Sequence, residues 1–325
     1  MSFRWMANQL WSSIWYLLPE GEYQYMRNNS GMHSVERNKR IWAYVFLAIP
    51  IIFYVSIRFY PTLYAFYLSV TDWNIVNKDI NFVGIENYRK LWSDSIFWKT
   101  LMNTFKYVGY GLPLSLLLGF ILAYQIDKVI NGDELLKALF FIPYITSMVA
   151  VAWVWKWLYQ PAPIGIFNNI LITLGIPQQA FLTSKTQALP SILGTTIWAD
   201  IGFQMIIFLA GLKAISQQYY EAAKIDGANN WQILGFLTIP LLKPTIVFLS
   251  VTGVIRYLRI FTQVMNMTFQ GEGGPLNSTK PLVLYIYDNA FKSFKMGYAA
   301  AMTVVLFGII LLVTVTQLMV TRDEK

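Results

Sequence analysis

The chain contains no cysteine and only one histidine, His33, in its 325 residues. Disulfides, thiolate nucleophiles, Cys/His zinc sites and histidine-dependent catalytic triads are therefore excluded by the lack of the required side chains. No G-x-x-x-x-G-K-[ST] stretch occurs either, so the chain lacks the loop that holds nucleotide phosphates in P-loop proteins. These absences exclude most hydrolytic chemistry and the hydrolysis of nucleotide through a P-loop.

Charged residues are also scarce. They make up 13% of the chain, against about a quarter in an ordinary soluble domain, while 56% of the residues are hydrophobic. Long apolar runs recur, and a bilayer core needs about 20 mostly apolar residues per helix. The composition predicts an all-α polytopic membrane protein that contacts lipid, with no nucleic acid as a partner.

The apolar runs predict six transmembrane helices. The expected spans are residues 41–57, 107–126, 138–158, 189–212, 245–265 and 297–320. The fifth span is the least typical, because it contains Arg256 and Arg259, whereas runs such as 107–126 carry no charge.

Residues 1–40 lack the compact pattern of a cleaved signal peptide, so we expect them to be retained as an amino-terminal extension. One face of a helix there would be polar, and the other would be apolar. Such a helix suits either the membrane interface or packing against the other spans. The apolar face would consist of Phe3, Met6, Leu10, Ile14 and Leu17.

The polar connectors differ in character. Residues 58–99 mix both signs of charge and suggest a folded cap outside the membrane, whereas residues 160–187 are typical of a long loop with at most a short helix. The stretch GEGGPLNST, at 271–279, requires a tight turn. If the amino terminus is cytoplasmic, 12 of the 25 basic residues lie inside, so charge alone does not determine the orientation.

The stretch YYEAAKIDGANNWQILGFLTIPLLKPT, residues 219–245, is a compact polar insert between two apolar segments. It predicts a helix that ends at Ile225, a left-handed Gly227, and a second helix from Asn229 or Asn230 to about Pro240. Ser216 is the expected N-cap of the first helix. The insert suits either docking of another protein or an interfacial loop held by Trp231.

The same stretch resembles the EAA loop of the membrane subunits of bacterial ATP-binding-cassette importers. Glu221, Ala222 and Ala223 are followed after three residues by Gly227, and after nine more by Leu-Thr-Ile-Pro ending at Pro240. Further stretches resemble the sugar-type permeases of this family, in the same order and over most of the chain from residue 41. They are PTLYAFYLSVTDWN (61–74), FVGIENYRKLW (82–92), the pair Asn103 and Thr104, GEGGPLNST (271–279) and KMGYAAAMTVVL (295–306).

The resemblance implies a type I ABC importer permease fold and a coupling loop at residues 213–244 that docks in a cleft of a separate ATPase subunit. Glu221 would be its charged anchor and Gly227 the turn between its two helices, with Ala222, Ala223 and Asp226 beside them. Because the ATPase is cytoplasmic, both termini would be inside the bacterial inner membrane. Gly273, Gly274 and Pro275 would face a periplasmic substrate-binding protein.

The resemblance also implies the other components. The chain would work with a second homologous permease subunit and with two ATPase subunits, which would hold the ATP and Mg²⁺. It would itself be a transport subunit, not an enzyme, with no cofactor or metal of its own. The amino-terminal extension and the net charge of +8 are similar to those of the first membrane subunit of bacterial alginate importers. An acidic oligosaccharide is therefore the expected substrate, with neutral malto-oligosaccharides or glycerol phosphate as alternatives.

Four polar residues inside expected spans are candidates for the substrate path. Arg256 and Arg259 share a face of the fifth span and would suit a carboxylate-bearing substrate, or they snorkel to the headgroups. Asp200 and Gln204 share a face of the fourth span, where a hydrogen bond between spans or an ion pair with one of the arginines is the alternative.

Two other classes of function remain open from the residues alone. In a proton-coupled sugar transporter, Asp200 would relay protons and no ATPase would be needed. A membrane enzyme acting on polysaccharide would need two acids at one pocket, and only Asp200 lies within an expected span.

Overall fold

The structure is a computed structural model that describes residues 32–76, 80–128 and 132–322. The chain forms two compact units, residues 1–64 and 65–325, and each is described by itself. The regular secondary structure in the described part is helical, apart from one isolated bridge between Thr71 and Phe82. The amphipathic helix expected between Phe3 and Leu17 lies outside the described residues.

The described part of the first unit is a long apolar helical segment. It comprises α3 (Met32–Tyr54), the π-helical turn η1 (Val55–Phe59) and the first half of α4 (Tyr60–Ser69). None of its residues from 38 to 64 is buried, and Phe46 and Ile49 are 68% and 66% exposed. Apolar surface of this extent requires lipid or another protein as its neighbour.

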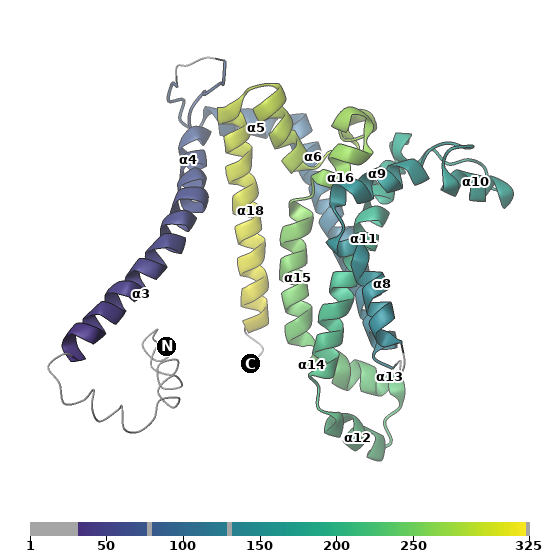
Figure 1. Cartoon of the computed structure of the whole chain (residues 1–325). Coiled ribbons are helices and arrows are strands. Elements are labelled where there is room, and N and C mark those ends of the chain that lie inside the picture. Colours follow the sequence, from purple (N-terminus) through teal and green to yellow (C-terminus); the bar gives the residue numbers. More distant parts are fainter. Residues whose placement is uncertain (1–31, 77–79, 129–131, 323–325) are drawn as a thin grey trace. The chain divides into compact units, whose positions relative to one another are not determined.

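The second unit contains the remaining helices (Figure 1). In chain order these are α5 (Glu86–Ser93), α6 (Ser95–Lys106), η2 (Tyr107–Gly111), α7 (Leu112–Ile126), α8 (Asp133–Ile145), α9 (Met148–Leu158), α10 (Ile166–Thr173), η3 (Phe181–Thr183), α11 (Ala188–Lys213), α12 (Gln217–Ile225), α13 (Asn230–Gln232), η4 (Ile233–Thr238), α14 (Ile239–Leu241), α15 (Lys243–Leu258), α16 (Thr262–Met267), η5 (Phe269–Gly271), η6 (Pro275–Asn277), α17 (Leu282–Tyr287), η7 (Asp288–Lys292) and α18 (Met296–Arg322).

Four helical stretches in the described part are long and apolar enough to cross a membrane. They are Asn38–Ser69, Ser95–Ile126, Ala188–Lys213 and Met296–Met319. Two bent pairs pass the same test together, Glu134–Ile145 with Met148–Leu158 and Asn230–Leu241 with Lys243–Leu258, bent by 95° and 63°. The number of candidate spans is thus four to six.

The helices differ from the expected spans at particular places. The first helical stretch continues to Ser69 and the second begins at Ser95, so the connector expected at 58–99 is much shorter. Charge misleads here, because Lys99 lies on α6 and its ammonium group reaches the backbone carbonyl of Leu276. The span expected at 138–158 is bent between α8 and α9, because the backbone of Thr146 and Ser147 has left the helical conformation, with ψ values of 143° and 122°.

Helix α11 lies at the centre of the second unit. It packs against α7 and α8, and two-thirds (67%) of its apolar window is buried. The largest buried cluster joins it to α15 and to η2, and it includes Tyr107, Ile192 and Tyr257. The helix that carries Asp200 is therefore shielded by its neighbours over most of its length.

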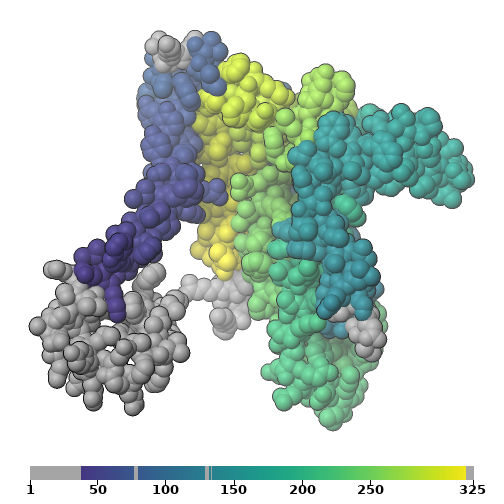
Figure 2. All heavy atoms as spheres, viewed as in Figure 1, coloured from purple at the N-terminus to yellow at the C-terminus, as the bar shows by residue number. Residues whose placement is uncertain are grey.

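Residues 160–180 project from the rest of the second unit, as the teal arm in Figure 2 shows. This arm contains the short helix α10, and the 3₁₀ turn η3 follows it; at most a short helix was expected in the 160–187 loop. Its exposed apolar side chains are Ile164, Ile166, Ile170, Ile172, Leu174 and Ile176. A row of exposed apolar side chains on an arm indicates contact with lipid or with another protein.

A single carboxylate joins three helices at the end of the second unit where α6 begins. Asp94 caps α6 by accepting hydrogen bonds from the amides of Ile96 and Phe97. Its Oδ2 also accepts hydrogen bonds from the hydroxyl groups of Tyr285 on α17 and Tyr298 on α18, at 2.6 and 2.7 Å. Asp94 therefore fixes the position of α17 and α18 relative to α6.

We expect Asp94→Ala to lower the stability of the protein by about 2 kcal/mol, because it removes a helix cap and two hydrogen bonds to a charged group. Asp94→Asn should cost less, because asparagine also caps helices. Thermal unfolding of the purified protein at pH 7 measures both changes. Equal melting temperatures for the wild type and Asp94→Ala would contradict this role.

The same carboxylate predicts a loss of stability in acid. Burial by itself raises the pKa of Asp94, but the hydrogen bonds from the two tyrosines and two backbone amides outweigh it and hold the pKa below its ordinary value. A lowered folded-state pKa means that the stabilisation is complete above the unfolded value of about 3.9 and is lost as the pH falls below it. The difference between wild type and Asp94→Asn should therefore shrink below about pH 4.

Candidate functional site

The loop between α11 and α15 forms one end of the second unit, far from α5 and α16 at the other end (Figure 1). Its first helix, α12, ends in a motif that closes the last turn. The amide of Ala228 donates to the carbonyl of Ala223, and the amide of Gly227 donates to the carbonyl of Lys224. Gly227 has a φ of +79°, the left-handed conformation that its position requires.

The second helix of the loop also begins with a defined cap. The Asn229 side chain accepts a hydrogen bond from the amide of Gln232, and the Gln232 side chain accepts one from the amide of Asn229. Beyond this capping box the chain continues helically through η4 and α14 to Leu241, one residue past the Pro240 boundary expected from the sequence. Thr238, which is 1% exposed, links the two helices through the hydroxyl of Tyr220 at 3.4 Å.

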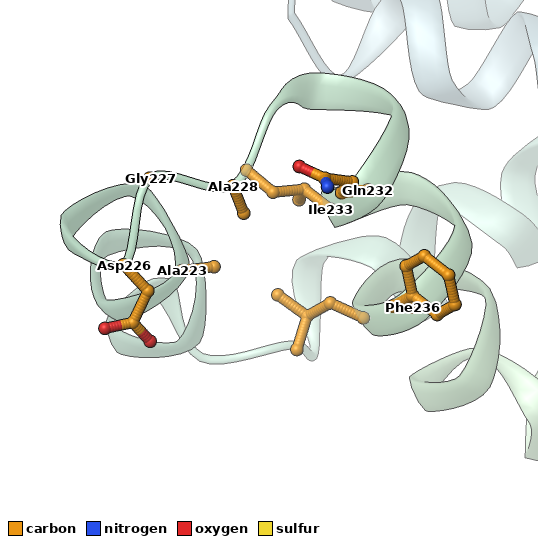
Figure 3. A pocket seen from close by; sticks show the side chains of 8 residues that line it. Ala223, Asp226, Gly227, Ala228, Gln232, Ile233 and Phe236 are labelled. Carbon is orange, nitrogen blue, oxygen red and sulfur yellow. The ribbon is translucent and has the colours of Figure 1, made fainter.

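The two helices enclose a shallow pocket of about 340 Å³ between them (Figure 3). Its walls are mostly small or aliphatic side chains, and the carboxylate of Asp226 lies at one edge. The apolar lining residues are Ala223, Gly227, Ala228, Ile233, Phe236 and Leu237. A concave, mainly apolar surface of this kind is suited to receive a side chain of another protein.

The loop residues expected from the sequence lie at its surface. Glu221, Ala222, Asp226 and Gly227 are exposed, and Ala223 is half-buried at the pocket wall. The carboxylates of Glu221 and Asp226 pair with no charged or polar group in the part of the chain that the structure describes.

Sequence reasoning missed the large apolar side chains of this loop. Ile225, Trp231 and Phe236 are 86%, 82% and 85% exposed. Such side chains are costly in water and indicate a surface that another protein or the membrane interface covers. Trp231 was considered only as a membrane anchor, and the other two have no local sequence feature that distinguishes them from core residues.

The structure joins two of the four intramembrane candidates. Arg256 on α15 donates to Asp200 Oδ1 on α11 at 2.7 Å, and its other terminal nitrogen donates to the hydroxyl of Tyr144 on α8 at 2.7 Å. Its guanidinium also lies 4.9 and 5.2 Å from the ring centroids of Tyr144 and Phe203, which stack on each other. Arg256 thus connects α15 to α11 and α8. Its ion pair with Asp200 was one of the alternatives expected from the sequence.

The burial of the two ends of this pair is unequal. The Asp200 side chain is 5% exposed, whereas that of Arg256 is 39% exposed. Next to the pair, Asp200 Oδ2, Gln204 Oε1 and Tyr257 Oη are buried and lack a hydrogen-bonding partner among the described residues. The cluster therefore retains unused hydrogen-bonding capacity inside the protein.

Arg259 does not join this cluster. It lies just past the end of α15, it is exposed, and its side chain contacts no charged or polar group among the residues described. Tyr144 and Phe203 were missed from the sequence, because they lie in apolar runs and Tyr144 is 112 positions from Arg256.

The turn expected at 271–279 lies at the end of the unit opposite the loop between α11 and α15 (Figure 1). Gly273 and Gly274 have φ values of +84° and +73°. Of the three residues expected to face outward, Gly273 is buried and Gly274 and Pro275 are half-buried. The exposed large side chains of this turn are Phe269 and Leu276, at 77% and 72%.

The turn is attached to α6 by polar side chains. Asn103 Nδ2 donates to the carbonyls of Asn277 and Lys280, and Thr104 Oγ1 accepts from the amide of Leu282. Tyr107 donates to the carbonyl of Thr279 at 3.0 Å. The pair Asn103 and Thr104, which contributed to the resemblance, therefore holds the turn in place.

Residues 32–324 match the family model described as binding-protein-dependent transport system inner membrane component. The chain belongs to this family. The lactose transport system permease protein LacF of Rhizobium radiobacter is 32% identical over 296 residues, which cover 90% of this chain and 98% of LacF. Relatives in this family are named as transport permeases, and the expectation of a membrane transport subunit rather than an enzyme is confirmed.

Two solved structures show the same fold. A crystal structure of a bacterial ABC transporter involved in the import of the acidic polysaccharide alginate matches with a TM-score of 0.78 and 23% identity, over 90% of this chain and 99% of that chain. The bacterial alginate ABC transporter in complex with an alginate pentasaccharide-bound periplasmic protein matches with a TM-score of 0.76 and 23% identity. The match covers 87% of this chain and 94% of that chain. The chain therefore has the type I ABC importer permease fold.

Proposed function

We propose that this chain is one of two homologous permease subunits of an ATP-driven importer of acidic oligosaccharides. Two separate ATPase subunits bind and hydrolyse ATP with Mg²⁺, and a periplasmic binding protein delivers the substrate. The two bent helix pairs each count as one span, so that six spans place both termini and the loop 217–241 on the cytoplasmic side.

The connectivity of the loop is the observation that carries the proposal. Helix α11, which contains Asp200, leads into the loop, and α15, which contains Arg256, leaves it. A force on the loop therefore acts on the two helices that the Asp200–Arg256 ion pair connects. Closure of the ATPase subunits favours one arrangement of α11 and α15 over the other, and the membrane path opens to alternate sides.

The docking surface is formed by both helices of the loop. The exposed carboxylate of Glu221 is the charged anchor, Ala222 and Ala223 allow close approach, and Gly227 sets the angle between the helices. The exposed apolar side chains of Ile225, Trp231 and Phe236 belong to the same loop and are covered by the ATPase.

Arg256 provides the selectivity for acidic substrates. Its guanidinium is partly exposed, and the polar atoms of Asp200, Gln204 and Tyr257 beside it remain unpaired among the described residues. A guanidinium binds carboxylates in a planar, bidentate geometry, so a uronic acid group can bind there while its hydroxyl groups pair with the neighbouring atoms. Arg259, at the exposed end of the same helix, attracts the anionic chain.

The other end of the unit receives the binding protein. The turn that contains Gly273, Gly274 and Pro275 presents Phe269 and Leu276 as exposed apolar contacts.

The likeness to alginate transporters in fold, the chain's net charge of +8 and the arginine in the membrane together favour an acidic saccharide.

Uptake into proteoliposomes that contain the purified complex tests the proposal. With loaded binding protein outside, labelled uronic acid oligosaccharide should enter only when ATP is inside, and a neutral oligosaccharide of equal length should enter much more slowly. Uptake driven by a proton gradient without ATP would contradict the proposal and favour proton relay through Asp200.

A further inference from the structure

A second pocket, with a polar lining, lies in the same unit as the coupling loop, on the side of α5 and α18. Its volume is about 510 Å³. Three separate segments of the chain line it, namely 72–74, 87–94 and 285–298. They include parts of the stretches DWN, ENYRKLW and KMGYAA, which the coupling role does not explain. The volume falls within the range of small-ligand sites.

Backbone contacts hold the walls of this pocket in place. The amide of Ile75 donates to the carbonyl of Phe294, and the amide of Gly297 donates to the carbonyl of Trp73. A Cβ atom at Gly297 would lie 2.0 Å from the carbonyl oxygen of Thr71, so only glycine allows this close approach. Asn87, 5% exposed, donates both amide hydrogens to the carbonyls of Ser69 and Thr71. The pocket is therefore preformed.

The lining leaves several polar groups available. The indole N–H of Trp73 and the ammonium group of Lys295 have no hydrogen-bonding partner among the described residues. The amide oxygens of Asn87 and Asn289 are also available, because these side chains use their amide hydrogens for backbone carbonyls. An aromatic ring beside amides and a cation is the set of groups that binds both the apolar face and the hydroxyl groups of a sugar.

The lining holds two carboxylates, Asp72 and Asp94, and two ammonium groups, Lys90 and Lys295, and of these only the ammonium groups can donate hydrogen bonds to an anionic ligand. The carboxylate of Asp94 accepts four hydrogen bonds, and that of Asp72 accepts hydrogen bonds from the backbone and side chain of Asn81. Lys295 has no counter-ion among the residues that the structure describes, and Lys90 lies 3.9 Å from Glu86 in a largely exposed pair. Exposed pairs of this kind are weak, so both lysines can bind an anionic group.

From this geometry we infer that the pocket is a saccharide-binding subsite for an acidic, uronate-type sugar unit on the extracytoplasmic side, separate from the Arg256 cluster. This inference rests on the proposed function, which places this end of the unit outside. A concave pocket with unused donors fits a sugar better than a docked protein, because protein interfaces are broad and have apolar centres.

Direct binding to the complex in nanodiscs, without ATP and without the binding protein, tests the inference. By calorimetry, an alginate tetrasaccharide should bind at least tenfold more tightly than maltotetraose. Trp73→Leu and Lys295→Gln should each weaken binding of the acidic probe at least tenfold. Trp157→Leu and Lys185→Gln, which alter exposed residues outside the pocket, should leave it unchanged.

Any of three results would contradict the inferred subsite. The acidic probe does not bind, both probes bind equally, or binding is unaffected by Trp73→Leu and Lys295→Gln. A photocrosslinker at Asn74 that captures the binding protein would show that a protein fills the pocket instead. Because no coupling is needed in this assay, ATP-driven uptake without tetrasaccharide binding would remove the subsite and leave the proposed function intact.

Discussion

Glu221→Arg is expected to lower ATP hydrolysis stimulated by loaded binding protein at least about 100-fold. The change places a cation where the docking surface presents an exposed carboxylate. Like charges brought together at an interface cost several kcal/mol, and about 3 kcal/mol corresponds to roughly two powers of ten in affinity. The measurement is ATPase activity of the reconstituted complex, with the amount of co-purified ATPase as a second readout.

Two other variants sharpen this test. Glu134→Arg reverses an exposed charge in the first turn of α8, outside the loop, and should retain most of the activity. Gly227→Ala should have an intermediate effect, because a Cβ meets no atom there but the left-handed backbone costs about 1 kcal/mol for alanine. If Glu221→Arg and Glu134→Arg behave alike, Glu221 is not an anchor.

Arg256→Leu is expected to destabilise the protein by roughly 3 kcal/mol, because it leaves the carboxylate of Asp200 buried without its partner. The value lies at the lower end for buried pairs, since the Arg256 side chain is 39% exposed. The double variant Asp200→Asn with Arg256→Leu removes both charges and should recover much of the loss. A double-mutant cycle of apparent melting temperatures measures this coupling, and additive effects of the two changes would contradict the ion pair.

The parts of the fold that the sequence predicted correctly are those with a local cause. The uncharged run at 107–126 and the apolar helix α18 needed only hydrophobicity, and the left-handed Gly227 and the start of the second loop helix at Asn230 needed only turn chemistry, whereas the Ser216 side chain makes no capping hydrogen bond. These features depend on neighbours within a few residues, so a single sequence contains the information.

The parts that were not predicted depend on contacts between distant residues. Tyr144 and Phe203 look like ordinary apolar-run residues until Arg256 contacts them. The start of the second helical stretch at Ser95 was obscured by Lys99 and Lys106, because long side chains can carry a charge away from an apolar helix. The burial of Gly273 follows from the attachment of its turn to α6, which no local pattern indicates.

Cysteine crosslinking tests the central claim most directly, because the natural chain contains no cysteine and each introduced thiol is unique. Ala222→Cys, in the coupling loop, should crosslink to an ATPase subunit. Leu276→Cys, at the opposite end, should not crosslink to it but should react with a membrane-impermeant maleimide from outside the cell membrane. This division of the two thiols between the two sides is the expected result. Reaction of Ala222→Cys with the outside reagent, or no ATPase crosslink from it, would contradict the claim that this loop couples the permease to ATP hydrolysis.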